Sequence, residues 1–504
     1  MHGKKIVGNS FVGIIYKILI LLIGFVSRKI FIVYLGEEIL GLNSLYANLL
    51  DLLNLADLGI GVAVQYQLYE PLVNDDKEKL SKILSATKRL YNYIGYGVLA
   101  SGVVISFFIQ YMIKDTQYTI SYVRSSFIIS VIGVAVSYFF VHKRLFLQAN
   151  EQLGIVNIID LISKVFVTII SLIATIITHN YFVYLIINVF YGIISNVTIH
   201  MFFSKKYAYL KSNCNDCSIE ISELTASLKD VIPMKLTNYI YNSTDNIIIS
   251  KVLGLSVVAM YSNYMTIING IMGIEVMYGN VVTSSMGKIF KEGRKSDELY
   301  RYYLVYQYIQ FIIVNFCTVS LVILCKPFIT MWIGSKYVVS NMVFVLLSVD
   351  FFVHSMYQPA YVMYGAAGKF REDKYITLAS AIVNIIVSIV FVNVIGLSGV
   401  IIGTIVSDIY IWILRSYQVV KLQFDKSVLN YGMKMIKYII ITLVSLAITT
   451  YSCNLFKIDS SIEDFILKIF MCMVIPNMIS ILSTILSADF KDGKELLMKI
   501  MKRG

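Results

Sequence analysis

Two adjacent cations interrupt an apolar stretch near the start of the chain. Arg28 and Lys29 stand together in "VSRKIFIVYLG" (residues 26–36), and Lys17 lies in the apolar run before them. On a helix with about 3.6 residues per turn, Lys17 and Arg28 share one face, whereas Lys29 points about 100° away. A guanidinium offers two parallel donors that match phosphate and keeps its charge at physiological pH. The pattern predicts an anion site along this face. The alternative is that the cations reach the headgroups at the end of the helix.

Polar residues also gather on one side of the next apolar segment. They are Asn43, Asp51, Asn54, Asp57 and Gln65, with Gly61 among them. A polar stripe on an otherwise apolar helix avoids lipid, so we expect it to line a polar cavity. Asp51 or Asp57 is a candidate counter-ion for Arg28, and Asn54 adds an amide to the same wall. Structural pairing of the aspartates is the equal alternative.

A similar polar face recurs in the second half of the chain. Lys235, Asn238, Asn242 and Asp245 follow helical spacing within residues 232–253. We predict that Lys235 and Asn242 line the same cationic cavity as Arg28 and Lys17.

A titratable group lies further along the second half. Asp350 and His354 are one helical turn apart, and Tyr357 and Tyr361 continue their face. Because histidine titrates near neutral pH, Asp350, His354 and Asp245 are candidates for ion or proton coupling. A histidine satisfied by packing is the alternative. Further charges in apolar segments have no identified partner: Lys164, Glu275 and Asp408.

The elements that carry these residues are apolar blocks. Of 504 residues, 57% are hydrophobic and 15% are charged, against about 25% charged in soluble proteins. Blocks of about 20 residues match a hydrocarbon layer of about 30 Å. The composition predicts an all-α polytopic membrane protein with about 14 spans. The expected spans are 11–35, 39–67, 91–112, 119–141, 154–178, 181–203, 232–253, 258–286, 300–325, 338–366, 375–394, 398–420, 434–455 and 463–486.

The charges also indicate an orientation. Most of the 43 Lys and Arg residues fall in the expected loops on the side of the N-terminus. The positive-inside rule and an even number of spans then put both termini in the cytoplasm. The net charge of +12 therefore reports topology, and no basic soluble domain predicts nucleic-acid binding. The single CxxC of Cys214 and Cys217 lacks further ligands, so we predict neither a metal nor a cofactor.

The chain contains a weak internal repeat. Aligning it with itself places Lys17 against Lys235, Ser44 against Ser262, and Leu35-Gly36 against Leu253-Gly254. We expect two six-helix bundles followed by two additional helices. The expected regions are an N-terminal lobe (1–203), a cytoplasmic linker (204–230), a C-terminal lobe (231–420), and two further spans with a cytoplasmic tail (421–504). Transporters built from such repeats bind their substrate between the halves.

Several motifs resemble a known family. "DLGIGVAVQYQLYEPL" (57–72) resembles the end of the second span in Wzx-type oligosaccharide flippases of the multidrug/oligosaccharidyl-lipid/polysaccharide (MOP) exporter superfamily. "KPFITMWIG" (326–334) resembles the outer turn of that family. "GAAGKFRED" (365–373), "NII" (384–386) and "GLSG" (396–399) are similar to its second-lobe pattern.

This resemblance implies a function. Such proteins move undecaprenyl-pyrophosphate-linked repeat units from the inner to the outer leaflet by alternating access, for O-antigen, capsule or exopolysaccharide synthesis. The resemblance implies a bacterial cytoplasmic membrane protein that is not an enzyme. Its expected partners are a polyprenyl-pyrophosphate-linked glycan, membrane lipids and a polysaccharide polymerase. Arg28 matches the first-span arginine that is important in related flippases.

Two other functions compete with this interpretation. A multidrug cation antiporter of the same superfamily would share the span count but would be expected to have a more acidic cavity. A membrane polysaccharide polymerase or ligase would need reactive groups on a long external loop, and the longest expected outer loop is short.

Overall fold

The computed structural model describes residues 2–54, 60–210, 244–291, 296–367, 370–456, 461–487, 490–493 and 495. The chain divides into two compact units, Met1–Ser262 and Asn263–Gly504. The sequence-based lobe boundaries remain predictions.

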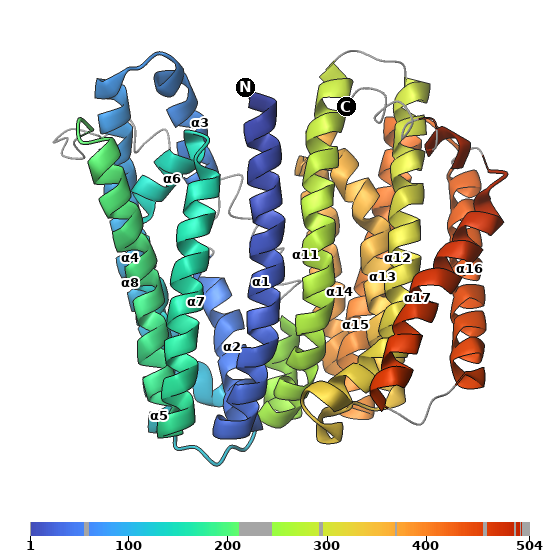
Figure 1. Ribbon diagram of the computed structural model, residues 1–504, viewed down its shortest axis with the longest axis horizontal. Helices are drawn as coiled ribbons and strands as arrows, with labels where there is room; N and C mark the ends of the chain where they lie inside the picture. Colours follow the sequence, from blue (N-terminus) through green and yellow to red (C-terminus); the bar gives the residue numbers. More distant parts are fainter. Residues whose placement is uncertain are drawn as a thin grey trace. The chain divides into compact units, whose positions relative to one another are not determined.

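The regular elements described in the first unit are all helices (Figure 1). Its helices are α1 (His2–Leu35), α2 (Glu37–Leu53), α3 (Ile60–Val73), α4 (Lys77–Phe108), the 3-10 turn η2 (Ile109–Met112), α5 (Ile120–Tyr138), α6 (Val141–Ala149), α7 (Leu153–Thr178) and α8 (Tyr181–Lys206). Residues 244–252 are also helical.

The second unit is helical in the same way. Its helices are α11 (Leu255–Lys291), whose first two turns belong to the first unit, α12 (Ser296–Trp332), the 3-10 turn η3 (Ser335–Tyr337), α13 (Asn341–Ala367), α14 (Phe370–Ile395), α15 (Leu397–Tyr417), the π-helical turn η4 (Gln418–Gln423), α16 (Val428–Leu455) and α17 (Ser461–Thr484).

These helices make the chain a multi-pass membrane protein. Among the described residues, 11 helices are long and apolar enough to cross a bilayer. The predicted spans from 258–286 onward each correspond to one helix, from α11 to α17. The predicted span 39–67 corresponds to two helices, α2 and α3, on either side of residues 55–59, which lie outside the described residues.

The two turns that the repeat aligns share one backbone conformation. Gly36 follows α1 with a φ of 88°, and Gly254 precedes α11 with a φ of 95°. Glycine occupies this left-handed region without the steric penalty of a Cβ atom. The same sharp reversal therefore begins α2 in one half and α11 in the other.

Helices α1 and α7 lie side by side in the first unit (Figure 1). The rings of Tyr34, near the end of α1, and His179, which follows α7, are 5.3 Å apart. This contact brings the C-terminal ends of the two helices to one level. Depths along α1 and α7 can therefore be compared from these ends.

Small residues let α14 and α15 approach closely in the second unit. A Cβ atom on Gly399 would lie 2.3 Å from the backbone carbonyl of Phe391. A Cβ atom on Gly403 would lie 2.1 Å from the Oγ of Ser388. Close backbone packing at small residues is how membrane helices gain contact area where water supplies no driving force.

We predict that Gly399→Ala lowers the free energy of unfolding by about 1–3 kcal/mol, because the new methyl group overlaps backbone that cannot move away. Gly432→Ala in α16 is the matched control, since no atom lies within 4 Å of the added Cβ. Unfolding of the detergent-solubilised protein measures both variants. Equal stability of the two variants would contradict the tight α14–α15 contact.

Candidate functional site

Arg28 is held by two hydroxyl groups in the first unit. One of its terminal nitrogens donates to the Oγ of Ser262 at 2.6 Å and to the Oγ of Ser44 at 3.3 Å. The two serine oxygens are 3.2 Å apart. Ser44 also donates to the carbonyl of Leu40, and Ser262 to that of Ala259, each at 2.9 Å. Both serine oxygens therefore have lone pairs that accept from the guanidinium.

These two hydroxyl contacts orient the guanidinium of Arg28. Hydroxyl groups accept hydrogen bonds but carry no charge. The side chain is half-buried, whereas the neighbouring Lys29 is exposed. A half-buried guanidinium held by neutral acceptors suits an incoming anion.

Aromatic rings flank Arg28 on the same side of α1. The ring of Phe31, one turn along, is 4.9 Å from that of Tyr184 and 5.9 Å from that of Tyr181. The Tyr184 hydroxyl lies within electrostatic range of the guanidinium. Arg28 thus lies where residues of α1, α2 and α8 come together.

Part of the predicted polar stripe holds helices together. Tyr181 donates to Asn43 at 3.1 Å, and Tyr138 donates to Asn54 at 2.9 Å. Gln65 donates to Gln148 of α6 at 2.9 Å. These amides join α2 and α3 to α5, α6 and α8. The sequence analysis predicted that all of these residues line a cavity, and it did not predict their partners on other helices.

The other members of that stripe have different positions. Asp51 is exposed on α2, two turns beyond Ser44. Asp57 lies outside the described residues, as do Lys235, Asn238 and Asn242, together with the side chain of Lys17. Their assignment to the cavity remains a prediction.

Two further arginines pair with carboxylates. Arg144 of α6 contacts Asp160 of α7 through two hydrogen bonds of 2.5 and 3.0 Å. Arg415 of α15 contacts Asp373 of α14 at 2.6 and 2.9 Å and is fully enclosed in the second unit. The rings of Tyr357 and Tyr361 lie 5.2 and 4.9 Å from its guanidinium. These matched pairs are structural, because each cation has its own anion.

His354 lies in a hydrogen-bonded group within the second unit. Its Nδ1 is 3.1 Å from a carboxylate oxygen of Asp408 and 2.8 Å from the hydroxyl of Tyr357. Its Nε2 is 3.2 Å from the amide of Gln358. The carboxylate that bonds the ring, Asp408, therefore comes from α15. The sequence analysis had identified no partner for it. Asp408 is fully buried, and its second oxygen has no hydrogen bond among the described residues.

The remaining predicted coupling residues are also buried. Asp350 lies in α13, one turn before His354. Asp245 lies in the first unit, where Tyr261 donates to it at 3.2 Å. Glu275 of α11 accepts from Ser355 at 2.7 Å. No described group of three or more His, Cys, Asp or Glu side chains is arranged to hold a metal ion.

A basic cluster lies where α6 meets α8. Lys143 donates to Ser204 at 3.1 Å and lies 3.4 Å from His200. Burial, together with the charges of Lys143 and Lys88, lowers the pKa of His142 to about 3. His142 is therefore neutral at physiological pH, and the lysines carry the charge of the cluster.

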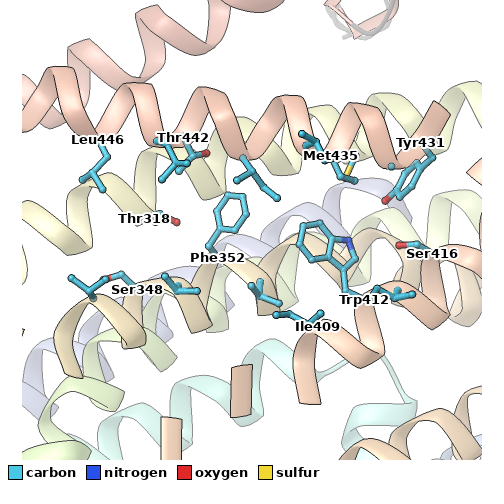
Figure 2. A pocket seen from close by; sticks show the side chains of 18 of the residues that line it. Thr318, Ser348, Phe352, Ile409, Trp412, Ser416, Tyr431, Met435, Thr442 and Leu446 are labelled. Atoms are coloured by element: carbon cyan, nitrogen blue, oxygen red, sulfur yellow. The ribbon is translucent and has the colours of Figure 1, made fainter. Parts of the chain in front are cut away.

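The second unit also contains an apolar cavity of about 580 Å³ between α16 and the pair α13 and α15. Figure 2 shows Phe352 and Trp412 pointing toward α16, from which Tyr431 and Met435 project. No charged side chain lines the cavity. Such a lining suits hydrocarbon.

The fold is shared with membrane transporters of known structure. The lipid II flippase MurJ, in an inward closed conformation, superimposes with a TM-score of 0.73 at 14% identity over 95% of this chain and 99% of that one. A multidrug resistance MATE family transporter of the MOP superfamily, facing inward, gives 0.67 at 14% identity over 82% and 99%. A MOP superfamily transporter from Pyrococcus furiosus, described as having a binding pocket of reverse polarity, gives 0.55 at 16% identity over 83% and 96%. No protein-family model and no curated protein sequence matches the chain. The chain therefore has the fold of these transporters.

We predict that the two kinds of arginine differ in their effect on stability. Arg415→Gln leaves the Asp373 carboxylate buried without its cation and should cost about 3–5 kcal/mol of unfolding free energy. Arg28→Gln removes hydrogen bonds to neutral hydroxyls and should cost about 1 kcal/mol. Denaturation of both variants in detergent measures the difference. Equal losses would make Arg28 a structural cation.

Proposed function

We propose that this protein is a flippase that carries polyprenyl-pyrophosphate-linked oligosaccharides from the inner to the outer leaflet of a bacterial cytoplasmic membrane. The observation that carries the proposal is Arg28, a half-buried guanidinium inside an apolar helix, oriented by Ser44 and Ser262. A cation in hydrocarbon is costly, so a guanidinium held there by two hydroxyls points to a role in binding an anion.

The substrate follows from the chemistry of this site. Guanidinium binds phosphate through parallel charge-assisted hydrogen bonds. A lipid-linked pyrophosphate brings such a group into the bilayer, while its polyprenyl tail stays in hydrocarbon. The hydroxyls and amides of the sugars suit polar side chains near Arg28, such as that of Tyr184.

The fold supports the same proposal. The MurJ structure, which this chain resembles in fold, is that of a lipid II flippase. In this proposal the protein works by alternating access, with both termini in the cytoplasm. Lys17, Lys235 and Asn242 would extend the cationic cavity, and surface polysaccharide synthesis, with a polysaccharide polymerase downstream, would use the product.

A multidrug cation antiporter is the second candidate, because the MATE transporter has the same fold. Arg28 disfavours it, since a guanidinium in the binding region repels cationic drugs. Resistance to toxic cations, conferred without any glycan genes, would support the antiporter instead.

We predict that Arg28→Gln reduces surface glycan at least about tenfold in a flippase-null strain, because one charge-assisted phosphate contact is lost. Arg28→Lys should retain part of the activity, since it keeps the charge but loses the two-pronged geometry. Lys29→Gln, an exposed neighbour, is the matched control. Quantified surface glycan at equal membrane expression is the readout. Wild-type levels with Arg28→Gln would remove Arg28 from the mechanism.

We further propose that His354 and Asp408 couple transport to protons. When Nδ1 of His354 carries a hydrogen, it donates to Asp408; when it does not, it accepts from Tyr357. The position of one proton thus decides which helix the ring bonds. Asp245 and Asp350 remain candidates for the same path.

We predict that Asp408→Asn abolishes the response of transport to an imposed proton gradient, because an amide cannot exchange a proton with the imidazole. The measurement is flipping of a fluorescent lipid-linked sugar in proteoliposomes with and without the gradient. Asp425→Asn, an exposed carboxylate, is the control. An unchanged response in Asp408→Asn would exclude this pair as the coupling group.

A further inference from the structure

Lys164 is a second intramembrane cation in the first unit, and the proposed function leaves it unused. It lies within α7, far from either end of a helix that spans Leu153–Thr178. Its ammonium is 4.8 Å from the centre of the Tyr191 ring on α8. Among the described residues, no carboxylate forms an ion pair or hydrogen bond with it, and the nearby Asp160 of α7 is paired with Arg144.

The helix face of Lys164 excludes a lipid-facing position. Most of the exposed apolar residues of α7 lie on one stripe, among them Ile158, Ile162, Phe166, Ile169 and Ile173. The buried residues form the opposite stripe: Asp160, Val167, Ser171 and Thr175. At about 100° per residue, Lys164 falls in the middle of the buried stripe, about 160° from the exposed one. Its charge therefore faces protein or an aqueous space.

Tyr191 belongs to a polar stripe of α8. Tyr184, Asn188, Tyr191 and Ser195 follow one another at helical spacing on one face. Tyr184 accompanies Arg28 at one end of this stripe, and Tyr191 accompanies Lys164 further along. Asn188 lies between them, donates to the carbonyl of Tyr184 at 2.9 Å and also has a side-chain hydrogen bond with Tyr184.

The two cations are too far apart for one pyrophosphate. Tyr184 and Tyr191 are about 10 Å apart along α8 at about 1.5 Å per residue. The contact of Tyr34 with His179 places the C-terminal ends of α1 and α7 at the same depth. Counted along each helix axis from these ends, Lys164 lies about 13 Å further away than Arg28. The two phosphates of a pyrophosphate share one oxygen and are much closer together. The second cation therefore meets a different part of the head group.

We infer that Lys164 and Tyr191 form a second binding subsite, specific for an acidic sugar of the transported glycan. This inference rests on the proposed function and names its substrate class. Lys164 would pair with the sugar carboxylate, and the Tyr191 ring would stack against the C–H face of the sugar. Arg28 would hold the pyrophosphate at the same time.

Two soluble probes and one lipid probe test the subsite on the purified full-length protein. A glucuronate-containing tetrasaccharide and a neutral tetrasaccharide of equal length report on the sugar subsite, and farnesyl pyrophosphate reports on Arg28. Calorimetry measures all three affinities. Lys164→Gln should lower the affinity for the acidic tetrasaccharide about tenfold, because one charge-assisted contact is lost. The affinity for the neutral tetrasaccharide should change little.

Three variants sharpen the comparison. Arg28→Gln should lower the affinity for farnesyl pyrophosphate more than the affinity for the acidic tetrasaccharide. Lys164→Arg keeps the charge and should restore most of the affinity for the acidic tetrasaccharide. Lys29→Gln controls for overall charge, because Lys29 is exposed. Lys164→Gln leaves no described carboxylate without its cation, so it should remain folded, which size-exclusion chromatography checks.

Each outcome decides between the two proposals. Unchanged affinity of Lys164→Gln for the acidic tetrasaccharide overturns the subsite. Equal weakening of farnesyl pyrophosphate by Lys164→Gln and Arg28→Gln also overturns it, because both cations would then serve one phosphate, while the flippase proposal stands. If the wild type binds the acidic tetrasaccharide through Lys164 but does not bind farnesyl pyrophosphate, the flippase proposal fails and the acidic-sugar subsite stands.

Discussion

A positive charge inside a hydrocarbon layer is costly unless other groups stabilise it. The basic residues of the protein differ in which groups do so. Arg144 and Arg415 each meet an aspartate through two hydrogen bonds, so their charge is balanced within the fold. Arg28 is oriented by hydroxyl groups and Lys164 by an aromatic ring. The first pair joins helices, whereas we propose that the second pair contacts the substrate.

The sequence predicts the helices well because each span needs a long apolar run whatever its neighbours are. Arg28 was also identifiable, since a guanidinium in such a run stands out. Its partner Ser262 was aligned with Ser44 by the repeat, but no pattern indicated that both hydroxyls would contact one arginine. The pairing of Arg415 with Asp373, 42 residues earlier, likewise depends on how α14 packs against α15.

His354 shows the same limit within one helix. Helical spacing predicts neighbours along α13, and this correctly placed Tyr357 beside the ring. The carboxylate that the ring contacts comes from α15, and helical periodicity carries no information about a second helix. The sequence showed Lys164 as an intramembrane charge. That it lies on the buried side of α7 became clear only from the exposed fractions of the neighbouring side chains in the structure.

The serine pair has a consequence for how an anion would be oriented. Ser44 and Ser262 are equivalent positions of the repeat, but the position equivalent to Arg28 is Asn246, which carries no charge. Duplication thus supplied matching hydroxyls, while a guanidinium stands in one copy alone. An anion bound at the serine pair would therefore meet a guanidinium from the first copy of the repeat alone.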